Sequence, residues 1–397
     1  MLRVPLHKIE PGMVLARPIL SPQDPQRYLL QRNVEVPMEL VPRLRELGIN
    51  EIWIRHRALE FLEDVIDEEL SECQREVYCH VRRNFEQIMN GTTPEIEVNH
   101  FQSSISELFD FLKQSQAGNI FLSKLDAFDN YLMSHSTNVC YLALLLGLKL
   151  EDYLVQERTF KTAREAKDLQ LLGLGCLLHD VGKMGIPPEI LNKPGKLTPQ
   201  EMDIIREHPV RGHEMVRGHL PLAAAEVVLN HHQRFDGTGY PERVDVRTGE
   251  TRPPLAGKQI PIFSRIATVA DVYDAATTKR CYSGAKPPIQ ALYEMRHYCR
   301  GFFDPVVEQA FYQIIPPFPI GQVIVLNNGM EAAVVDFNPR YATRPKVQCL
   351  KDPYGAPLAD PSLEELDLAF HDDLHIAFVD GVDVRPFQPE LAWAAAL

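Results

Sequence analysis

The chain has 397 residues, of which 45% are hydrophobic and 24% are charged. At roughly 100–200 residues per domain, this length predicts two or three domains. The net charge of −13 argues against a nucleic-acid polymer as partner, because phosphate backbones bind clustered Lys and Arg. No stretch approaches the roughly 20 apolar residues of a membrane span, and we expect no secretory signal. The seven scattered cysteines predict reduced thiols and a cytoplasmic protein.

Residues 1–56 have the pattern of a small N-terminal α/β module. A helix is expected within 34–47, over the segment MELVPRLREL, and Gly48 stands where a left-handed residue would end it. The alternating EIWIR at 51–55 predicts a strand. Residues 57–99 are charged, with apolar residues at helical spacing, and predict a helical connector. Its apolar stripe either packs on its own chain or serves dimerisation.

Residues 100–318 show helical periodicity in nearly every segment and predict an all-α domain. Thr198 and Glu201 have the spacing of a capping box at the start of one of these helices. The pattern changes in 319–385, where GQVIVL, NNG and MEAAVVDF predict a strand, a tight turn and a second strand. Residues 386–397 read as a tail. We therefore predict a multidomain chain, with a central all-α domain flanked by a small N-terminal α/β module and a small C-terminal β module.

Seven of the 14 histidines lie between positions 135 and 232. The candidate metal ligands are residues near the ends of predicted helices and one later acid: His135, His179, Asp180, His208, His231, His232 and Asp271. Imidazole and carboxylate together suit Mn, Fe, Ni or Zn. A carboxylate can bridge two ions roughly 3.5–4 Å apart, which favours a two-metal site. A lone histidine on an apolar helix is more often a core residue, and His213, His219 and His297 are assigned that role.

The segments around these residues resemble the HD-GYP family, a branch of the HD-domain metal-dependent phosphohydrolases. The likeness covers about residues 125–310. It rests on HDVGK at 179–183, KPGKLT at 193–198, HPVRG at 208–212 and HHQRFDGTGYP at 231–241. The triplet that names the family is Gly239, Tyr240 and Pro241, and the family's HSxxV helix matches His135, Ser136 and Val139.

The resemblance implies a central HD-type domain that hydrolyses cyclic di-GMP through a metal-bridging hydroxide. The product is linear pGpG, and whether a further step yields GMP stays open. It implies two divalent transition metal ions of open identity (Fe, Mn, Ni or Zn). One ion would be held by His135, His179, Asp180 and Asp271. The other would be held by Asp180, His208, His231 and His232. The catalytic residues implied are Asp180 and Lys183.

Substrate contacts are implied for four residues: Asp129, Lys183, Tyr240 and Arg280. Two of these side chains also have a structural alternative. Lys183 could be a solvated surface lysine, and Tyr240 could be a packing aromatic.

The chain departs from the family pattern at several positions. Tyr131 stands where members with a third metal carry Glu, so two ions are expected. Residues 242–257 are an insertion whose VDVRTGETR predicts a strand, a turn and a strand that cover the site mouth or meet a partner. Phe235 replaces the usual Trp. Cys281 and Ser283 replace a proline and a basic residue, which removes one expected phosphate contact.

Two other functions stay open. In the first, the domain is a catalytically weak cyclic-dinucleotide receptor or scaffold whose GYP loop recruits a partner protein. In the second, the enzyme acts on a different cyclic or linear dinucleotide. A homodimer is a further option that the sequence does not decide.

Overall fold

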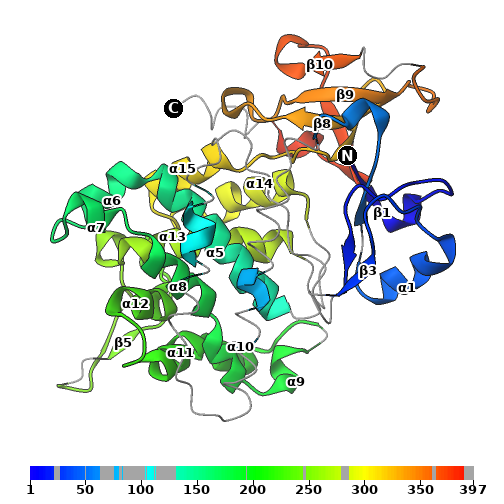
Figure 1. Cartoon of the computed structure of the whole chain (residues 1–397). Coiled ribbons are helices and arrows are strands. Elements are labelled where there is room, and N and C mark those ends of the chain that lie inside the picture. The colour runs from blue at the N-terminus through cyan, green and yellow to red at the C-terminus, as the bar shows by residue number, and fades with distance from the viewer. Residues whose placement is uncertain are drawn as a thin grey trace.

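The structure is a computed structural model that describes residues 1–21, 27–49, 51–62, 76–79, 83, 103, 105–110, 112, 131–193, 195–244, 247–278, 286–359 and 364–388. Three parts are visible in Figure 1: a helical body, a β-sheet above it, and an N-terminal module beside both. This arrangement confirms the predicted fold class. No helix in these described ranges is long and apolar enough to cross a membrane.

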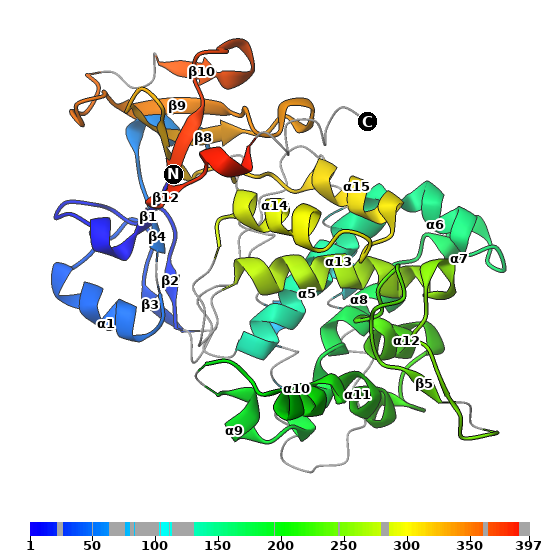
Figure 2. The same ribbon diagram turned by 180° about the vertical axis from the view of Figure 1, so that it is seen from behind.

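The helical body packs around two long helices, α5 (Tyr131–Lys149) and α13 (Ile262–Thr277), which cross near its centre (Figure 2). The other helices are α6 (Glu151–Glu157), α7 (Ala163–Ala166), α8 (Gln170–Leu178), α9 (Pro188–Leu191), α10 (Pro199–Arg206), α11 (His208–Val216), α12 (Leu222–Asn230), α14 (Pro288–Tyr298) and α15 (Pro305–Ile314). Helices α5, α8, α12 and α13 share a fully buried apolar core. Helix α10 begins with the predicted capping box, because Glu201 N–H donates to Thr198 Oγ1 at 3.2 Å and Thr198 N–H donates to Glu201 Oε2 at 2.7 Å.

The C-terminal module is a six-stranded antiparallel sheet in the order β10-β9-β8-β7-β11-β12. Its strands are β7 (Val323–Leu326), β8 (Glu331–Asp336), β9 (Lys346–Lys351), β10 (Glu365–Asp367), β11 (Ile376–Val379) and β12 (Val382–Asp383). The predicted β7–β8 hairpin is confirmed, and Gly329 in its turn has a φ of +90°. The sheet continues the apolar core of the helical body, on the side where α14 and α15 lie between the two parts (Figure 2).

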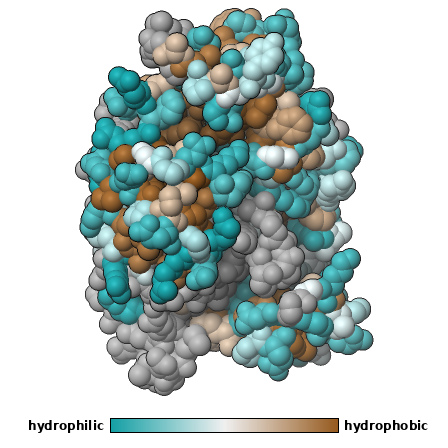
Figure 3. All heavy atoms as spheres, turned by 90° about the vertical axis from the view of Figure 1, so that its right-hand side faces the viewer, coloured by the Kyte–Doolittle hydropathy of each residue, from teal (hydrophilic) through white to brown (hydrophobic). Residues whose placement is uncertain are grey.

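In its described residues, the N-terminal module has four short strands and one α-helix. The strands are β1 (Leu2–Pro5), β2 (Ile19–Leu20), β3 (Tyr28–Leu30) and β4 (Glu51–Ile54). The predicted helix begins as a 3₁₀ turn at Met38–Leu40 and becomes α-helical only over α1 (Val41–Glu46); Gly48 follows it at a φ of +81°. On the side of the molecule that Figure 3 shows, apolar patches interrupt a mainly hydrophilic surface. The exposed large apolar side chains of this module include Tyr28, Val34 and Met38.

The N-terminal module and the C-terminal sheet pack against each other, although the chain separates them by more than 250 residues. Arg3 N–H donates to Gly321 O at 3.2 Å, next to β7. The Trp53 ring lies against Gly321, where any Cβ would overlap it and where φ is +83°. Buried apolar residues from both ends form one cluster: Met1, Ala16, Leu59, Leu62, Ile320, Ala333, Val335 and Leu350.

A buried ion-pair network holds α13 in place. The Arg265 guanidinium of α13 donates to Glu157 Oε2 at the end of α6 and to Asp304 Oδ2 at the start of α15, each at 2.5 Å. Tyr153 OH donates to the same Asp304 oxygen at 2.9 Å. The side chains of Arg265, Glu157 and Asp304 are all at least nine-tenths buried. Position and tilt of α13 matter for function because this helix carries Asp271.

Replacing Arg265 by alanine is expected to lower the free energy of unfolding by about 3–5 kcal/mol, since two buried carboxylates lose their partner. Urea unfolding followed by circular dichroism measures this loss. The matched control is Lys258→Ala. Lys258 pairs with Glu157 at 2.6 Å from the surface, with its side chain 68% exposed, and its loss should cost at most about 1 kcal/mol. Equal losses for the two variants would contradict the structural role of the buried pair.

Candidate metal centre

Five helices bring the predicted ligands to one place inside the helical body. His135 lies in the second turn of α5, and His179 and Asp180 directly follow α8. His208 is the first residue of α11, the pair His231–His232 follows α12, and Asp271 lies in α13. All these side chains are buried except that of His232, which is 23% exposed. Neighbouring imidazole rings have centroids 4.1–5.3 Å apart.

The Asp180 carboxylate lies between two sets of imidazoles. Its Oδ2 faces His135 Nε2 at 3.6 Å and His179 Nε2 at 3.5 Å. Its Oδ1 faces His208 Nε2 at 3.2 Å and His231 Nε2 at 3.9 Å. Each oxygen therefore points to a different pair of nitrogens, which is the arrangement of a carboxylate that bridges two cations.

Two donor groups result, which we call group A and group B. Group A consists of His135, His179 and Asp180, and group B of Asp180, His208, His231 and His232. In each group, one donor atom per residue lies within 4.8 Å of every other. Asp271 contacts both groups, because its Oδ1 lies 3.1 Å from His135 Nε2 and its Oδ2 lies 3.5 Å from His232 Nδ1. The sequence had assigned it to one ion only.

Backbone carbonyls fix the orientation of three of the rings. The Nδ1 atoms of His179, His208 and His231 donate to the carbonyl oxygens three residues earlier, namely Cys176 (2.7 Å), Ile205 (2.7 Å) and Val228 (2.9 Å). With its proton held at Nδ1, each ring presents the lone pair of Nε2 to the centre. Metal-binding histidines in proteins are oriented in the same way.

Two buried atoms at the centre are left without a hydrogen-bond partner among the described residues: His179 Nε2 and Asp180 Oδ1. His208 does not satisfy Oδ1 at 3.2 Å, since the proton of that ring is engaged with Ile205 O. A buried unpaired polar atom costs about 1–3 kcal/mol. A divalent cation accepts lone pairs from both atoms, so the donors present fit a metal.

The protonation of the side chains at the centre also favours a bound cation. Burial lowers the pKa of His231 well below its usual range and lowers the pKa of His232 to about 3, so both rings are neutral. Burial alone would raise the pKa of Asp180, but the Lys183 ammonium and the imidazoles of His179 and His208 together outweigh it and hold the pKa well below the ordinary value. Burial also opposes ionisation of Asp271, but the hydrogen bond from His135 and the neighbouring imidazoles together outweigh it and hold the pKa well below the ordinary value. The neutral imidazoles of His231 and His232, next to two carboxylates of low pKa, favour a bound cation.

Two motif glycines let the backbone around Asp180 pack closely. Gly182 lies in the 3₁₀ turn η4 (Val181–Gly185), which follows Asp180 and packs on α11. A Cβ at Gly182 would overlap the carbonyl oxygen of His208, and it would lie 2.5 Å from the backbone nitrogen of Gly212. The glycines of HDVGK and HPVRG thus allow the backbones that carry Asp180 and His208 to touch.

The GYP loop packs on the histidine pair. Tyr240 N–H donates to His232 O at 3.1 Å, and the Tyr240 ring stacks on the His232 ring with centroids 4.6 Å apart. A Cβ at Gly239 would overlap the backbone of Arg234. Tyr240 is partly exposed. It therefore packs against a candidate ligand and also borders the solvent-facing side of the centre.

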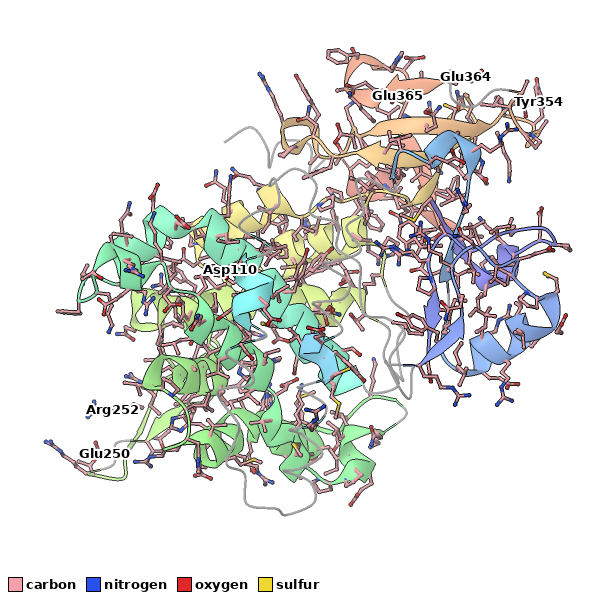
Figure 4. All side chains as sticks on the ribbon, in the orientation of Figure 1. Asp110, Glu250, Arg252, Tyr354, Glu364 and Glu365 are labelled. Carbon is pink, nitrogen blue, oxygen red and sulfur yellow. The ribbon has the colours of Figure 1, made fainter. Side chains whose placement is uncertain are left out.

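The insertion after the GYP triplet is the expected hairpin, with strands β5 (Arg243–Val244) and β6 (Thr251–Arg252). Gln233 closes its base, since Nε2 donates to Pro241 O at 2.8 Å and Oε1 accepts from Leu255 N–H at 2.9 Å. The hairpin projects away from the helical body, with Glu250 and Arg252 near its end (Figure 4). Of the two roles left open, an outward-facing surface fits this direction better than a cover over the site.

Lys183 is not a freely solvated lysine, because its Nζ lies 2.5 Å from Asp180 Oδ2 and its side chain is only 19% exposed. Several other predicted positions lie outside the described residues: Asp129, Arg280, Cys281, Ser283 and the side chain of Tyr131. Among the described residues, His213, His219 and His297 belong to neither donor group. His297 stacks on Tyr293 with centroids 5.2 Å apart.

Sequence reasoning missed Asp274, whose Oδ2 lies 2.7 Å from His135 Nδ1. Both side chains are 1% exposed. The available signal was the spacing DVYD at 271–274, which places two carboxylates one helical turn apart on α13.

Two family models match the chain. Residues 149–307 match the HD domain, and residues 323–381 match the KOW domain associated with HD domains. Most of the helical region thus matches an HD domain. It carries the His-Asp pair and the Gly-Tyr-Pro triplet of the HD-GYP pattern, and the β-sheet matches the KOW domain associated with HD domains. HD-domain phosphohydrolases depend on metal, in agreement with the donor groups described above.

Several curated relatives match part of the chain. A cyclic di-GMP phosphodiesterase of Pseudomonas aeruginosa is 34% identical over 64% of this chain and 56% of its own length. A cyclic di-GMP phosphodiesterase of Vibrio cholerae is 35% identical over 43% of this chain and 34% of its own length. The 3'3'-cGAMP-specific phosphodiesterase 2 of the same organism is 44% identical over 26% of this chain and 19% of its own length. The chain thus spans little more than half of the first relative and less of the other two.

Proposed function

We propose that this chain is a metal-dependent phosphodiesterase that hydrolyses cyclic di-GMP to linear pGpG, using two divalent cations of the Fe, Mn, Ni or Zn type. The observation that carries the proposal is the Asp180 carboxylate, with one oxygen directed to group A and the other to group B. His135, His179, Asp180 and Asp271 would hold one ion, and Asp180, His208, His231 and His232 the other. The names of the first two relatives support cyclic di-GMP as substrate.

When bound, the cations stabilise negative charge on the phosphodiester and lower the pKa of water enough to supply a nucleophile near neutral pH. The chain's own residues orient the substrate. The partly exposed ligand His232, the Tyr240 ring stacked on it and the Lys183 ammonium mark the solvent-facing side of the centre. Lys183 lies beside Asp180 and can pair with a phosphate oxygen. Tyr240 offers an aromatic face to a guanine, and such stacking is sequence-tolerant but favourable.

The decisive test compares metal content and hydrolysis in the purified protein and two histidine variants. His179→Ala should lose metal and lower the rate of cyclic di-GMP breakdown by at least about 100-fold, because a ligand of group A is removed. His297→Ala should change neither, since His297 stacks on Tyr293 away from both groups. Metal loss in His297→Ala, or full turnover in His179→Ala, would refute the assignment. Chromatography of the products distinguishes pGpG from GMP.

A different cyclic dinucleotide is the second candidate substrate, and the relative named for 3'3'-cGAMP favours including it. When both dinucleotides compete in one reaction at equal concentration, the ratio of their initial hydrolysis rates equals the ratio of their kcat/KM values. A ratio above about tenfold assigns the preferred substrate. Binding of cyclic di-GMP without turnover by the metal-loaded protein would instead favour the receptor or scaffold function, in which the GYP loop and the neighbouring hairpin contact a partner protein.

A further inference from the structure

His135 is held at both ring nitrogens by carboxylates of the same helix. Asp271 Oδ1 lies 3.1 Å from Nε2, and Asp274 Oδ2 lies 2.7 Å from Nδ1. The two acids are three residues apart in α13 and therefore share one face of this helix. A cation at group A can take Nε2, while Nδ1 keeps its hydrogen bond to Asp274.

The other oriented rings differ in the partner of Nδ1. His179, His208 and His231 each donate to a neutral backbone carbonyl, whereas His135 pairs with a charged carboxylate. A hydrogen bond to an ionised acceptor is stronger than one to a neutral acceptor. A carboxylate behind a metal-binding imidazole also fixes the ring and raises its basicity as a ligand. Group A therefore has a carboxylate at hydrogen-bond distance behind one ring, whereas the carboxylate contact of a group B ring, from His232 Nδ1 to Asp271 Oδ2, is longer at 3.5 Å.

Asp274 is itself fixed in position. Its Oδ1 accepts from Thr278 Oγ1 at 3.1 Å, and Thr278 is the residue that directly follows α13. Asp274 and Thr278 are 1% and 6% exposed. Burying a carboxylate is costly unless it has a partner. The pairing with His135 provides the partner.

We propose that Asp274 is a positioning residue that makes group A the tighter of the two metal positions. The charge behind His135 raises the affinity of that position, and the Thr278 hydroxyl keeps the carboxylate on Nδ1. Asp274 itself contacts neither metal nor substrate. The inference rests on the two-metal centre of the proposed function. It adds that, as metal is supplied, group A binds its ion before group B does.

The test is calorimetric titration of the metal-free protein with Zn²⁺ at pH 9, where a proton on His135 competes least with the cation. The two positions appear as two binding steps. Asp274→Asn retains the shape and an acceptor oxygen but removes the charge. It should weaken the tighter step by about 10- to 100-fold and leave the weaker step unchanged. His208→Ala assigns the steps, because it should remove only the weaker one. Weakening of both steps by the same factor, or of neither, would overturn the proposal.

A second variant covers the case in which Asp274→Asn does not fold, which thermal unfolding of the metal-free proteins would reveal. Thr278→Val is nearly the same size and leaves the carboxylate charged but less well held. It should weaken the same step by a smaller factor, and an unchanged tighter step would overturn the proposal. The readout is independent of turnover. Two-ion binding without hydrolysis would refute the proposed function alone, whereas hydrolysis with an unchanged titration of both variants would refute this inference alone.

Discussion

Asp180→Ala is expected to abolish metal binding at both positions and to lower the rate of cyclic dinucleotide hydrolysis by at least about a thousandfold. Both groups lose a donor at once, because each Asp180 oxygen faces a different pair of imidazoles. Cations contribute several kcal/mol to the stabilisation of a charged transition state, and about 4 kcal/mol corresponds to a factor of roughly 10³. Elemental analysis of the purified variant and a hydrolysis assay give the two readouts.

The control for this variant is Asp203→Ala. Asp203 lies on α10, is 70% exposed and pairs with Arg206 at 3.4 Å, so its removal should leave metal content and rate unchanged. An Asp180→Ala protein that keeps two ions would refute the site. One that keeps a single ion at full occupancy would show that Asp180 is essential to only one position, contrary to a bridging role.

Metal affinity at the two positions is expected to depend differently on pH. Although burial opposes it, hydrogen bonds with Asp271 and Asp274 raise the pKa of His135 to about 9. Below that pH the metal-free ring is protonated, and a cation must displace the proton. Affinity at group A should therefore rise about tenfold per pH unit between pH 7 and 9 and level off above it. His231 and His232 are neutral throughout this range, and they add no such dependence to group B.

Titrations with Zn²⁺ at pH 7, 8 and 9, each in two buffers of different ionisation enthalpy, measure affinity and proton release together. The step assigned to group A should release about one proton at pH 7.5. His135→Ala is the matched control, and it should remove the pH-dependent step. Identical slopes for both steps in the unaltered protein would contradict the raised pKa of His135.

Much of the local structure was predictable because it depends on residues close together in the chain. The capping box of Thr198 and Glu201 and the β7–β8 hairpin each follow from a spacing of a few residues. The division of the chain into a helical body and two small modules followed from changes in periodicity. The helix predicted at 38–47 was only partly right, since its first turn is 3₁₀.

The candidate ligands were also readable in the sequence, since imidazoles and carboxylates cluster in a few motifs, and their resemblance to the HD-GYP pattern suggested which of them belong together. Their mutual geometry was not readable. Whether Asp271 touches one donor group or both depends on how α13 packs. Arg265 joins this helix to Glu157 at the end of α6 and to Asp304 at the start of α15. The predicted contacts of Asp129 and Arg280 stay predictions, because both lie outside the described residues.

Composition, periodicity and motif spacing thus determined the class of each segment and the kind of chemistry to expect from it. The three-dimensional packing decided the rest: the two directions of the Asp180 oxygens, the carboxylate behind His135, the contact between Gly182 and Gly212, and the core shared by both ends of the chain. The physical reason is the separation along the chain of the residues that interact. Turns, caps and helical faces arise from interactions over a few residues, whereas each of these contacts joins segments whose approach depends on the packing of the whole domain.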